Sequence, residues 1–346
     1  MTEKTYRAGI VGLGFIGGGD QVSGDALGQQ VSDLDGTHAE AYVDCPRTEL
    51  VCGSSRNAGR RERFEARTGA KTYADWREMV AEESLDIVSI ATYTPYHAEI
   101  TEACAEHGAR AVFCEKPIAS TVADGLRMIE ACEQADAILA INHNRRFTPS
   151  YRRLRDFVAE GGLGELTSCT LQWGSGRLGN VGTHMIDALQ MLTGRQVEAV
   201  TGVLDLSGKP DCRGEQFSDP GGWGLMRLEG GVMVTLDAAD YGSVPVILGL
   251  NGSKGQAVTG RRGVDLTFAD GRTDHWPAHA RGTSMDLAVS EIVAWLDGAG
   301  DFPYSPRGAL RTLEAILGFH VSHDREGAWV ALPLAGEDRQ RELKSG

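Results

Sequence analysis

The sequence predicts an α/β protein with an N-terminal doubly wound parallel sheet and a C-terminal α+β domain that contains a large, mainly antiparallel sheet. Two patterns support this prediction. Short apolar runs alternate with helical periods in the first half of the chain, and hairpin signals follow one another in the second half. The length of 346 residues suits two domains, which we expect to cover residues 1–146 and 147–346.

The first half contains five β-rich runs separated by helical stretches. The runs predicted to be strands are Tyr6–Val11, Glu49–Ser54, Ile87–Ala91, Ala111–Cys114 and Ala137–Asn142. The predicted helices between them include His38–Val43, Trp76–Glu82, His97–His107 and Ala123–Gln134. Because strands that alternate with helices are joined by right-handed crossovers, this pattern predicts a parallel sheet.

The pattern changes after a helix predicted around Ser150–Ala159. The strands predicted beyond it are Leu166–Trp173, Val197–Leu206, Trp223–Leu228, Val232–Asp237 and Val246–Leu250. Turn sequences at residues 229–231 and 251–252 are typical of hairpins, so this sheet should be mainly antiparallel. The predicted helices of the second half are Thr183–Leu192, Ser284–Leu296 and Arg307–Ser322.

Charge and composition exclude several classes of protein. Lys and Arg total 34 against 48 Asp and Glu, so the net charge of −14 offers no basic surface to nucleic acid. No apolar run approaches the ~18 residues of a membrane helix, and the N-terminus lacks the apolar region of a signal peptide. We therefore expect a soluble, cytoplasmic protein that binds neither nucleic acid nor membrane. Its seven scattered cysteines are expected to be reduced core thiols.

A glycine motif follows the first predicted strand. Gly12, Gly14 and Gly17 have the spacing Gly-x-Gly-x-x-Gly, with Phe15 and Ile16 between the last two. In dinucleotide-binding Rossmann domains this spacing permits a tight turn and lets a pyrophosphate approach backbone N–H groups at a helix start. The motif predicts that these five residues bind a dinucleotide cofactor.

The same spacing occurs again at Gly174, Gly176 and Gly179, so the motif alone does not choose between the two sites. The first copy opens a series of strand–helix units, whereas the second lies in a predicted antiparallel region without a topological switch point. We therefore favour the first copy as the cofactor site and interpret the second as a tight loop on the substrate side.

A polar, glycine-rich insertion, Gly18–Gly36, separates the first motif from the next predicted helix. Either the first helix begins late, or a loop leaves it after its first turn. Because the insertion is too polar to form a core of its own, we expect it to lie over the cofactor mouth.

The end of the second predicted strand bears on the choice of cofactor. NAD sites place a carboxylate there to bind the ribose diol, but this chain has Ser55 and Arg56, with Arg60 and Arg61 behind them. A guanidinium and hydroxyl groups suit a 2′-phosphate. We predict NADP as the cofactor, with NAD as the alternative in which Arg56 is simply a solvated residue.

Several further motifs occur in the order and spacing of one enzyme family. They are Thr92–His97, Glu115–Pro117, Asn144–Phe147, Asn180-x3-His184-x2-Asp187, Pro303–Val321 and Val330–Pro333. Together with the first glycine motif, they make the chain resemble the Gfo/Idh/MocA oxidoreductases over nearly its whole length. The resemblance implies a Rossmann domain followed by an open-faced antiparallel sheet, and NAD(P)-dependent oxidation or reduction of sugars, sugar derivatives or cyclic polyols.

The resemblance also implies roles for individual residues. Lys116, whose bond to Pro117 should be cis, would bind the substrate oxygen and stabilise a developing alkoxide. His184 would be the catalytic acid/base, with Asn180 as its orienting partner in place of the commoner Asp. Further cofactor contacts are expected from Thr92, His97, Glu115 and Lys116. Substrate contacts are expected from Asn144, Arg145, Arg146, Asn180 and Asp187.

The spacing of Asn180, His184 and Asp187 would place all three on one face of a helix. Such a face could also hold a metal, but a third ligand of the right type is lacking, so we expect no metal site. Apolar residues occur on more than one face of the second predicted sheet, at Leu225, Leu228, Val232, Val234 and Leu236. We therefore expect a homodimer or homotetramer.

Two other functions remain open at this stage. A NAD-dependent glycosidase with transient C3 oxidation would release sugar without net consumption of cofactor. A non-enzymatic, cofactor-sensing regulator would lack the acid/base pair, whereas Lys116 and His184 are both present here.

Overall fold

The chain forms two compact units in a computed structural model. The structure describes residues 4–22, 30–207, 214, 216–240, 242, 244–260, 262–278, 282–300 and 302–345. The first unit comprises Met1–Ala119, Asp124–Asn144 and Gly282–Arg307. The second comprises Ser120–Ala123, Arg145–Arg281 and Gly308–Gly346.

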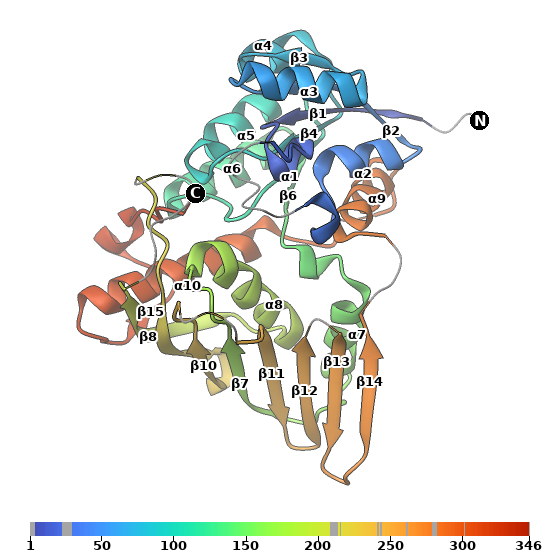
Figure 1. Ribbon diagram of the computed structural model, residues 1–346. Coiled ribbons are helices and arrows are strands. Elements are labelled where there is room, and N and C mark those ends of the chain that lie inside the picture. The colour runs from blue at the N-terminus through green and yellow to red at the C-terminus, as the bar shows by residue number, and fades with distance from the viewer. Residues whose placement is uncertain are drawn as a thin grey trace. The chain divides into compact units, whose positions relative to one another are not determined.

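A parallel sheet forms the centre of the first unit. Within the described residues it has six strands in the order β3-β2-β1-β4-β5-β6. They are β1 Tyr6–Val11, β2 Thr48–Ser54, β3 Lys71–Tyr73, β4 Ile87–Ile90, β5 Ala111–Cys114 and β6 Ile138–Ile141. The first of them, β1, is the dark blue strand in Figure 1. All neighbours are parallel, which confirms the predicted doubly wound sheet. The strand order reverses between β1 and β4, so their carboxyl ends form the topological switch point.

The helices of the first unit come from two distant parts of the chain. They are α1 Phe15–Gly18, α2 His38–Asp44, α3 Ala58–Thr68, α4 Trp76–Glu82, α5 His97–Glu106, α6 Val122–Gln134 and α9 Ser284–Leu296. The end of α9 is bound to β1, because Tyr6 Oη donates a hydrogen bond of 2.8 Å to Asp297 Oδ1. Arg110 Nη2 also donates to the carbonyl of Leu296 over 3.3 Å. Residues 282–307 therefore pack with the N-terminal sheet although they follow the second sheet in sequence.

The helix expected after the glycine motif is divided into two pieces. α1 ends after Gly18, since Gly19 adopts a φ of 69°, and α2 begins at His38 behind its N-cap Thr37. Of the two expected arrangements, a loop that leaves the helix after its first turn is the one observed. Residues 23–29 of this insertion lie outside the described residues, and the expectation that the insertion covers the cofactor mouth stays a prediction.

Both described ends of the insertion are anchored by carboxylates. Asp20, which is 1% exposed, accepts two hydrogen bonds from Arg63 of α3, at 2.9 and 2.8 Å. Asp35 accepts a hydrogen bond of 2.9 Å from the backbone N–H of Ser284 at the start of α9. The path of the chain into and out of the insertion is therefore fixed.

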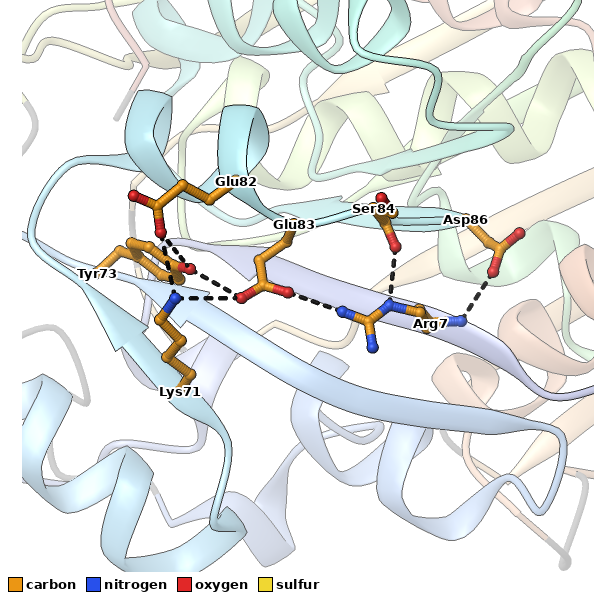
Figure 2. A network of polar contacts seen from close by, with 7 residues as sticks. All are labelled: Arg7, Lys71, Tyr73, Glu82, Glu83, Ser84 and Asp86. Atoms are coloured by element: carbon orange, nitrogen blue, oxygen red, sulfur yellow. Dashed lines mark hydrogen bonds and ion pairs between the residues drawn. The ribbon is translucent and has the colours of Figure 1, made fainter.

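A polar network ties β1 and β3 to the end of α4 (Figure 2). Glu83 lies at its centre, with its carboxylate 2.7 Å from Arg7 Nη2 and 3.4 Å from Lys71 Nζ. Tyr73 Oη donates to the same carboxylate over 2.8 Å. The hydrogen bond from Tyr73 and the charges of Lys71 and Arg7 hold the pKa of Glu83 below its usual value. A half-exposed edge strand is thereby joined to the sheet by charge as well as by its backbone ladder.

The second unit contains a mixed sheet in the order β14-β13-β12-β11-β7-β10-β9-β8-β15, nine strands among the described residues. The strands are β7 Leu166–Gln172, β8 Val197–Asp205, β9 Gly221–Leu228, β10 Met233–Asp237, β11 Ile247–Gly252, β12 Gly255–Gly260, β13 Gly263–Phe268, β14 Thr273–Pro277 and β15 Val330–Ala331. β7 and β10 are parallel, and the other neighbours are antiparallel. The predicted large, mainly antiparallel sheet is confirmed.

Helices α7 Pro149–Ala159, α8 Thr183–Thr193 and α10 Pro306–Asp324 accompany this sheet. Phe319 of α10 packs on one face, where Gly202 and Gly224 leave it room. A Cβ at Gly224 would lie 2.5 Å from the Phe319 ring. The opposite face carries Trp223 and Leu225 of β9, which are 45% and 38% exposed. The sheet thus has one face covered by a helix and one with exposed apolar side chains.

None of the helices described is both long and apolar enough to cross a membrane. The cysteines that the structure describes are free thiols, and five of them are buried. Burial raises the pKa of Cys52, Cys132 and Cys169 to about 12, so these thiols stay protonated at neutral pH.

Candidate functional site

The first glycine motif forms a tight turn between β1 and α1 at the switch point of the parallel sheet. Gly12 has a φ of 104°, and a Cβ there would lie 2.3 Å from the carbonyl oxygen of Ala91. A Cβ at Gly17 would lie 2.0 Å from the carbonyl oxygen of Gly12. Only glycine therefore allows this turn to pack against the end of β4. Such a turn leaves the backbone accessible to a pyrophosphate group, so the residues present fit a dinucleotide.

The other residues of this motif differ in how a ligand could reach them. Gly14 is the N-cap of α1 and has no side chain to block its neighbours' N–H groups. Phe15 is only 4% exposed and belongs to the core, so a contact with cofactor would come from its backbone. Ile16 is half-buried. α1 has four residues, so the turn itself supplies more of the site than a helix dipole does.

The loop after β2 contains the two residues expected near the adenosine ribose. Ser55 Oγ accepts a hydrogen bond of 3.3 Å from the Asn57 N–H. Arg56 is exposed, and its guanidinium lies 5.8 Å from the centroid of the Tyr96 ring. Arg61, in contrast, donates to the Ser55 carbonyl over 2.7 Å. Arg61 therefore supports the backbone of this loop, while Arg56 faces solvent.

Two loops at neighbouring strand ends are joined by His97. This side chain is 0% exposed; its Nδ1 lies 3.0 Å from the Pro117 carbonyl and its Nε2 3.1 Å from the Thr92 carbonyl. Burial lowers the pKa of His97. His97 thus positions Thr92 and the Lys116–Pro117 segment, and its ring nitrogens are engaged with protein. The Lys116–Pro117 bond is cis, as the family resemblance implies.

Glu115 and Lys116 follow directly after β5. Glu115 Oε1 accepts hydrogen bonds from His38 Nε2 at 3.1 Å and from Asn142 Nδ2 at 2.6 Å. Burial alone would raise the pKa of Glu115, but these hydrogen bonds and the charge of Lys116 lower it to about 2. Glu115 is therefore an ionised carboxylate that the protein itself binds. A direct contact between this group and a cofactor stays a prediction.

Asn180 lies in a π-helical turn, Leu178–Gly182, at the start of α8. Before the turn, Arg177 adopts a φ of 63°, which is uncommon for a residue with a side chain. The carboxylate of Asp219 accepts the backbone N–H groups of Gly179 and Asn180 at 2.7 and 2.8 Å, and Ser345 Oγ donates to it over 3.0 Å. π-turns and left-handed residues occur often at functional sites, so this segment is a good candidate for one.

His184 stands in the first turn of α8 and is half-buried. Asp187, one turn later, is 0% exposed and forms a two-pronged ion pair with Arg146, with N–O distances from 2.7 to 3.0 Å. The three predicted positions are thus not equivalent: Asn180 and His184 are partly exposed, whereas Asp187 is closed off by its partner. Arg146 would meet a substrate as half of an ion pair.

Two other predicted substrate contacts are already engaged with protein. Asn144 Nδ2 donates to Asp35 Oδ2 over 3.4 Å, which connects the loop after β6 to the insertion. Arg145 Nε donates to Tyr151 Oη over 3.2 Å. Among the described residues, no group of three or more His, Cys, Asp or Glu side chains is arranged to hold a metal ion.

The second glycine motif forms close contacts within its own unit. A Cβ at Gly174 would lie 2.5 Å from the carbonyl oxygen of Gly242, and one at Gly179 would lie 2.7 Å from Ser345 Cβ. Gly176 has a φ of 59°. The three glycines thus allow two loops and the C-terminal segment to pack together, in keeping with a tight loop.

Sequence reasoning missed three residues that organise these loops. Asp219 lies in a stretch with no regular pattern, so no sequence signal pointed to it. His38 and Ser89 could have been noticed, because a buried strand, residues 87–91, contains one Ser among apolar residues and needs a polar partner for it. The partner, His38, lies beyond the insertion.

Two sequence profiles of one family match the chain. The profile described as oxidoreductase family, NAD-binding Rossmann fold, matches residues 6–143. The profile of the GFO/IDH/MocA C-terminal domain matches residues 151–258.

Characterised proteins are similar to parts of the chain. Levoglucosan dehydrogenase of Pseudarthrobacter phenanthrenivorans is 28% identical over 222 residues, which cover 58% of this chain and 54% of that protein. Myo-inositol 2-dehydrogenase of Thermotoga maritima is 31% identical over 160 residues, 46% of this chain and 42% of that protein. The matched segments thus span about half of these relatives' length or less.

A solved structure of levoglucosan dehydrogenase, in complex with NADH and levoglucosan, aligns with a TM-score of 0.78 at 22% identity. The alignment covers 95% of this chain and 100% of that one. At this identity the likeness demonstrates a shared fold. Two matching profiles, the glycine turn and the six-stranded parallel sheet followed by a nine-stranded mixed one lead to one assignment: the chain belongs to the Gfo/Idh/MocA family of oxidoreductases.

Proposed function

We propose that the protein is an NAD(P)-dependent oxidoreductase that transfers a hydride between the nicotinamide ring and a hydroxyl or carbonyl carbon of a sugar, sugar derivative or cyclic polyol. The observation that carries this proposal is the glycine turn at the switch point, with Lys116 at the carboxyl end of β5 in the same sheet. Open α/β sheets bind ligands at this edge. The two relatives named above, a levoglucosan dehydrogenase and a myo-inositol 2-dehydrogenase, support the substrate class.

Backbone groups of Gly12, Gly14 and Gly17 would hold the pyrophosphate, because their turn leaves N–H groups accessible. Thr92 would lie beside the cofactor at the end of β4, held there by His97. When bound, NAD(P) would supply or accept the hydride. The tasks left to this chain's side chains are to orient the substrate and to move the hydroxyl proton.

Lys116 and His184 would divide that task. The ammonium group of Lys116 binds the substrate oxygen and stabilises negative charge that develops on it, an interaction that strengthens toward the transition state. A ring nitrogen of His184 takes the hydroxyl proton during oxidation and returns it during reduction. Asn180, one helical turn earlier, orients the substrate by hydrogen bonding. Asn144, Arg145 and Arg146 complete the polar lining, and the buried Asp187 holds Arg146 in place.

We propose NADP as the preferred cofactor. Arg56 is exposed after β2, and no carboxylate follows this strand to bind a ribose diol. Arg61 donates to the Ser55 carbonyl and Arg63 donates to Asp20. The preference for NADP over NAD would therefore depend chiefly on Arg56 and the Ser55 hydroxyl.

An anaerobic panel of sugars and cyclic polyols tests the proposal. Levoglucosan and myo-inositol are its first members, and each compound is offered with NAD⁺ and with NADP⁺ while reduced nicotinamide is followed by absorbance. We expect stoichiometric reduction of cofactor with at least one compound. Release of an aglycone without net reduction would identify a glycosidase, and ligand binding without turnover across the panel would favour a sensor.

A further inference from the structure

A chain of buried polar side chains leads to the residue before Lys116. Tyr42 Oη lies 2.7 Å from Ser89 Oγ, and Ser89 Oγ lies 2.7 Å from His38 Nδ1. His38 Nε2 lies 3.1 Å from Glu115 Oε1. Tyr42, Ser89 and His38 are 0% exposed, and the Glu115 side chain is 12% exposed. Burying polar groups without partners is unfavourable, and each of these side chains has a partner. The hydrogen-bonded chain is therefore a structural feature of the first unit.

The Glu115 carboxylate is fixed by three elements. It follows β5, while His38 comes from α2 and Asn142 follows β6; both donate to the same oxygen, at 3.1 and 2.6 Å. The His38 ring packs against Phe113 of β5 with ring centroids 4.7 Å apart. The carboxylate therefore has little freedom to turn, and neither has the backbone that leads into Lys116.

The direction of the hydrogen bonds follows from the charge of Glu115. An ionised carboxylate only accepts, so His38 Nε2 carries a proton and donates it to Glu115 Oε1. At the other end, burial raises the pKa of Tyr42, so this residue remains a phenol. A chain that ends in a fully buried phenol is closed to solvent there. It can hold geometry and charge, but it does not carry protons in from outside.

We propose that His38 is a positioning residue for Lys116: by binding Glu115 it holds a fixed negative charge beside the lysine and thereby keeps the ammonium group charged and oriented toward the substrate oxygen. This inference rests on the role of Lys116 in the proposed function. The titratable groups that lower the pKa of Glu115 include His38 of α2 and Lys116 beside it in the chain. Glu115 in turn acts on the buried Cys114 of β5 and His97 of α5.

The charge on Lys116 can be measured without substrate or cofactor. Lysines of the full-length protein are reductively methylated with ¹³C-formaldehyde, and the Lys116 resonance is assigned by its loss in Lys116→Met. We expect the apparent pKa of this amine to fall by about one unit in Glu115→Gln, because a nearby opposite charge favours the ammonium form. His38→Leu should also lower the apparent pKa of Lys116, because the Glu115 carboxylate is then no longer held beside the lysine. His38→Gln should restore most of the parent value, since an amide can donate to Glu115.

Turnover provides the second readout. We expect His38→Leu to reduce kcat about 10- to 100-fold, the usual effect of removing an outer hydrogen-bond partner, with the KM for cofactor little changed. Ser89→Ala, at the far side of His38, should have a smaller effect than His38→Leu. Thermal unfolding of each variant separates loss of fold from loss of positioning, and His38→Ala, which also lacks a donor, is used if His38→Leu does not fold.

The two proposals fail in different ways. An unchanged Lys116 titration in Glu115→Gln, or in a His38 variant that cannot donate to Glu115, would overturn the inference, whatever the activity. A shifted titration together with full turnover of Lys116→Met would support the His38–Glu115 coupling and overturn the catalytic role of Lys116.

Discussion

At the scale of single residues, Arg56 makes the most selective prediction about the cofactor. Its guanidinium is exposed after β2, where a 2′-phosphate would be bound. We expect NADPH to bind more tightly than NADH. Arg56→Ala should reduce the difference between their binding free energies by about 1–2 kcal/mol, the usual value of a charge-assisted hydrogen bond. Fluorescence titration of both cofactors measures it. Arg77→Ala removes another exposed arginine with a ring contact and should leave the difference unchanged. Tighter NADH binding by the parent protein would contradict the prediction.

His320 predicts how stability responds to acid. Its ring is 7% exposed in α10, and burial lowers its pKa from 6.5 to about 4. The unfolded chain therefore takes up this proton near pH 6.5, whereas the folded chain resists until about pH 4, so stability falls as the pH drops through this window. The contribution is at most about 3 kcal/mol. Urea unfolding at pH 7 and pH 4.5 should show a smaller pH effect in His320→Leu than in the parent. An equal effect in both proteins would contradict it.

The turn glycines could be interpreted from the sequence, whereas several long-range contacts required the structure. Gly12 and Gly17 could be interpreted from spacing, because a tight turn demands glycine at fixed positions. Asp187 could be placed on a helix, but its pairing with Arg146 could not be foreseen, because the two are 41 positions apart. The same is true of His38 and Glu115, which are 77 positions apart.

At the scale of elements, the network around Glu83 should stabilise the β3 edge of the parallel sheet (Figure 2). The Glu83 side chain is 16% exposed and binds Arg7, Lys71 and Tyr73, whereas that of Glu82 is 59% exposed. We expect Glu83→Ala to lower the free energy of unfolding by about 2 kcal/mol, because Arg7 loses its carboxylate and the buried Tyr73 keeps only the exposed Glu82 as acceptor. Glu82→Ala is the matched control and should have a much smaller effect. Equal losses in urea unfolding would show that burial of the carboxylate is not the cause.

The strands that sequence analysis missed have short or weak apolar patterns of their own. β3 has three residues and only Tyr73 is buried, so its apolar signal is too short to recognise. β12, β13 and β14 are rich in Gly, Thr and Asp and pair as successive hairpins, so their stability comes from the ladder with a neighbour rather than from their own apolar pattern. The central strands of both sheets could be predicted because about half or more of the residues in each of them are buried.

At the scale of the whole molecule, the exposed face of the second sheet predicts self-association. Val203 and Trp223 are paired across β8 and β9 and are 44% and 45% exposed. Apolar side chains gathered on one face commonly mark an interface. We expect light scattering to give a particle mass of at least twice the chain mass of 37.1 kDa. Trp223→Glu should lower the particle mass toward that of one chain. Val43→Glu, at an exposed position of α2, should leave it unchanged. A particle of one chain mass would contradict the prediction.

The sequence could not predict which residues make up each of the two units. A change of pattern near residue 146 indicated a division of the chain, but α9 returns to the first unit after the second sheet. That return depends on contacts such as Tyr6 with Asp297, which are 291 positions apart. Local patterns indicate which elements form; long-range partners decide which unit each joins.

Direct hydride transfer is the central claim, and isotope transfer tests it most directly. The substrate found in the panel is labelled with deuterium at its carbinol carbon, and the reduced cofactor is analysed by mass spectrometry in single-turnover reactions of the parent, Lys116→Met and His184→Ala. We predict that deuterium moves to the cofactor in the parent, at a rate that rises with pH because the accepting base must be neutral. Both variants should react about 10²–10⁴ times more slowly, with cofactor affinity nearly unchanged. Reduced cofactor without deuterium, or parent rates in both variants, would contradict the proposed chemistry.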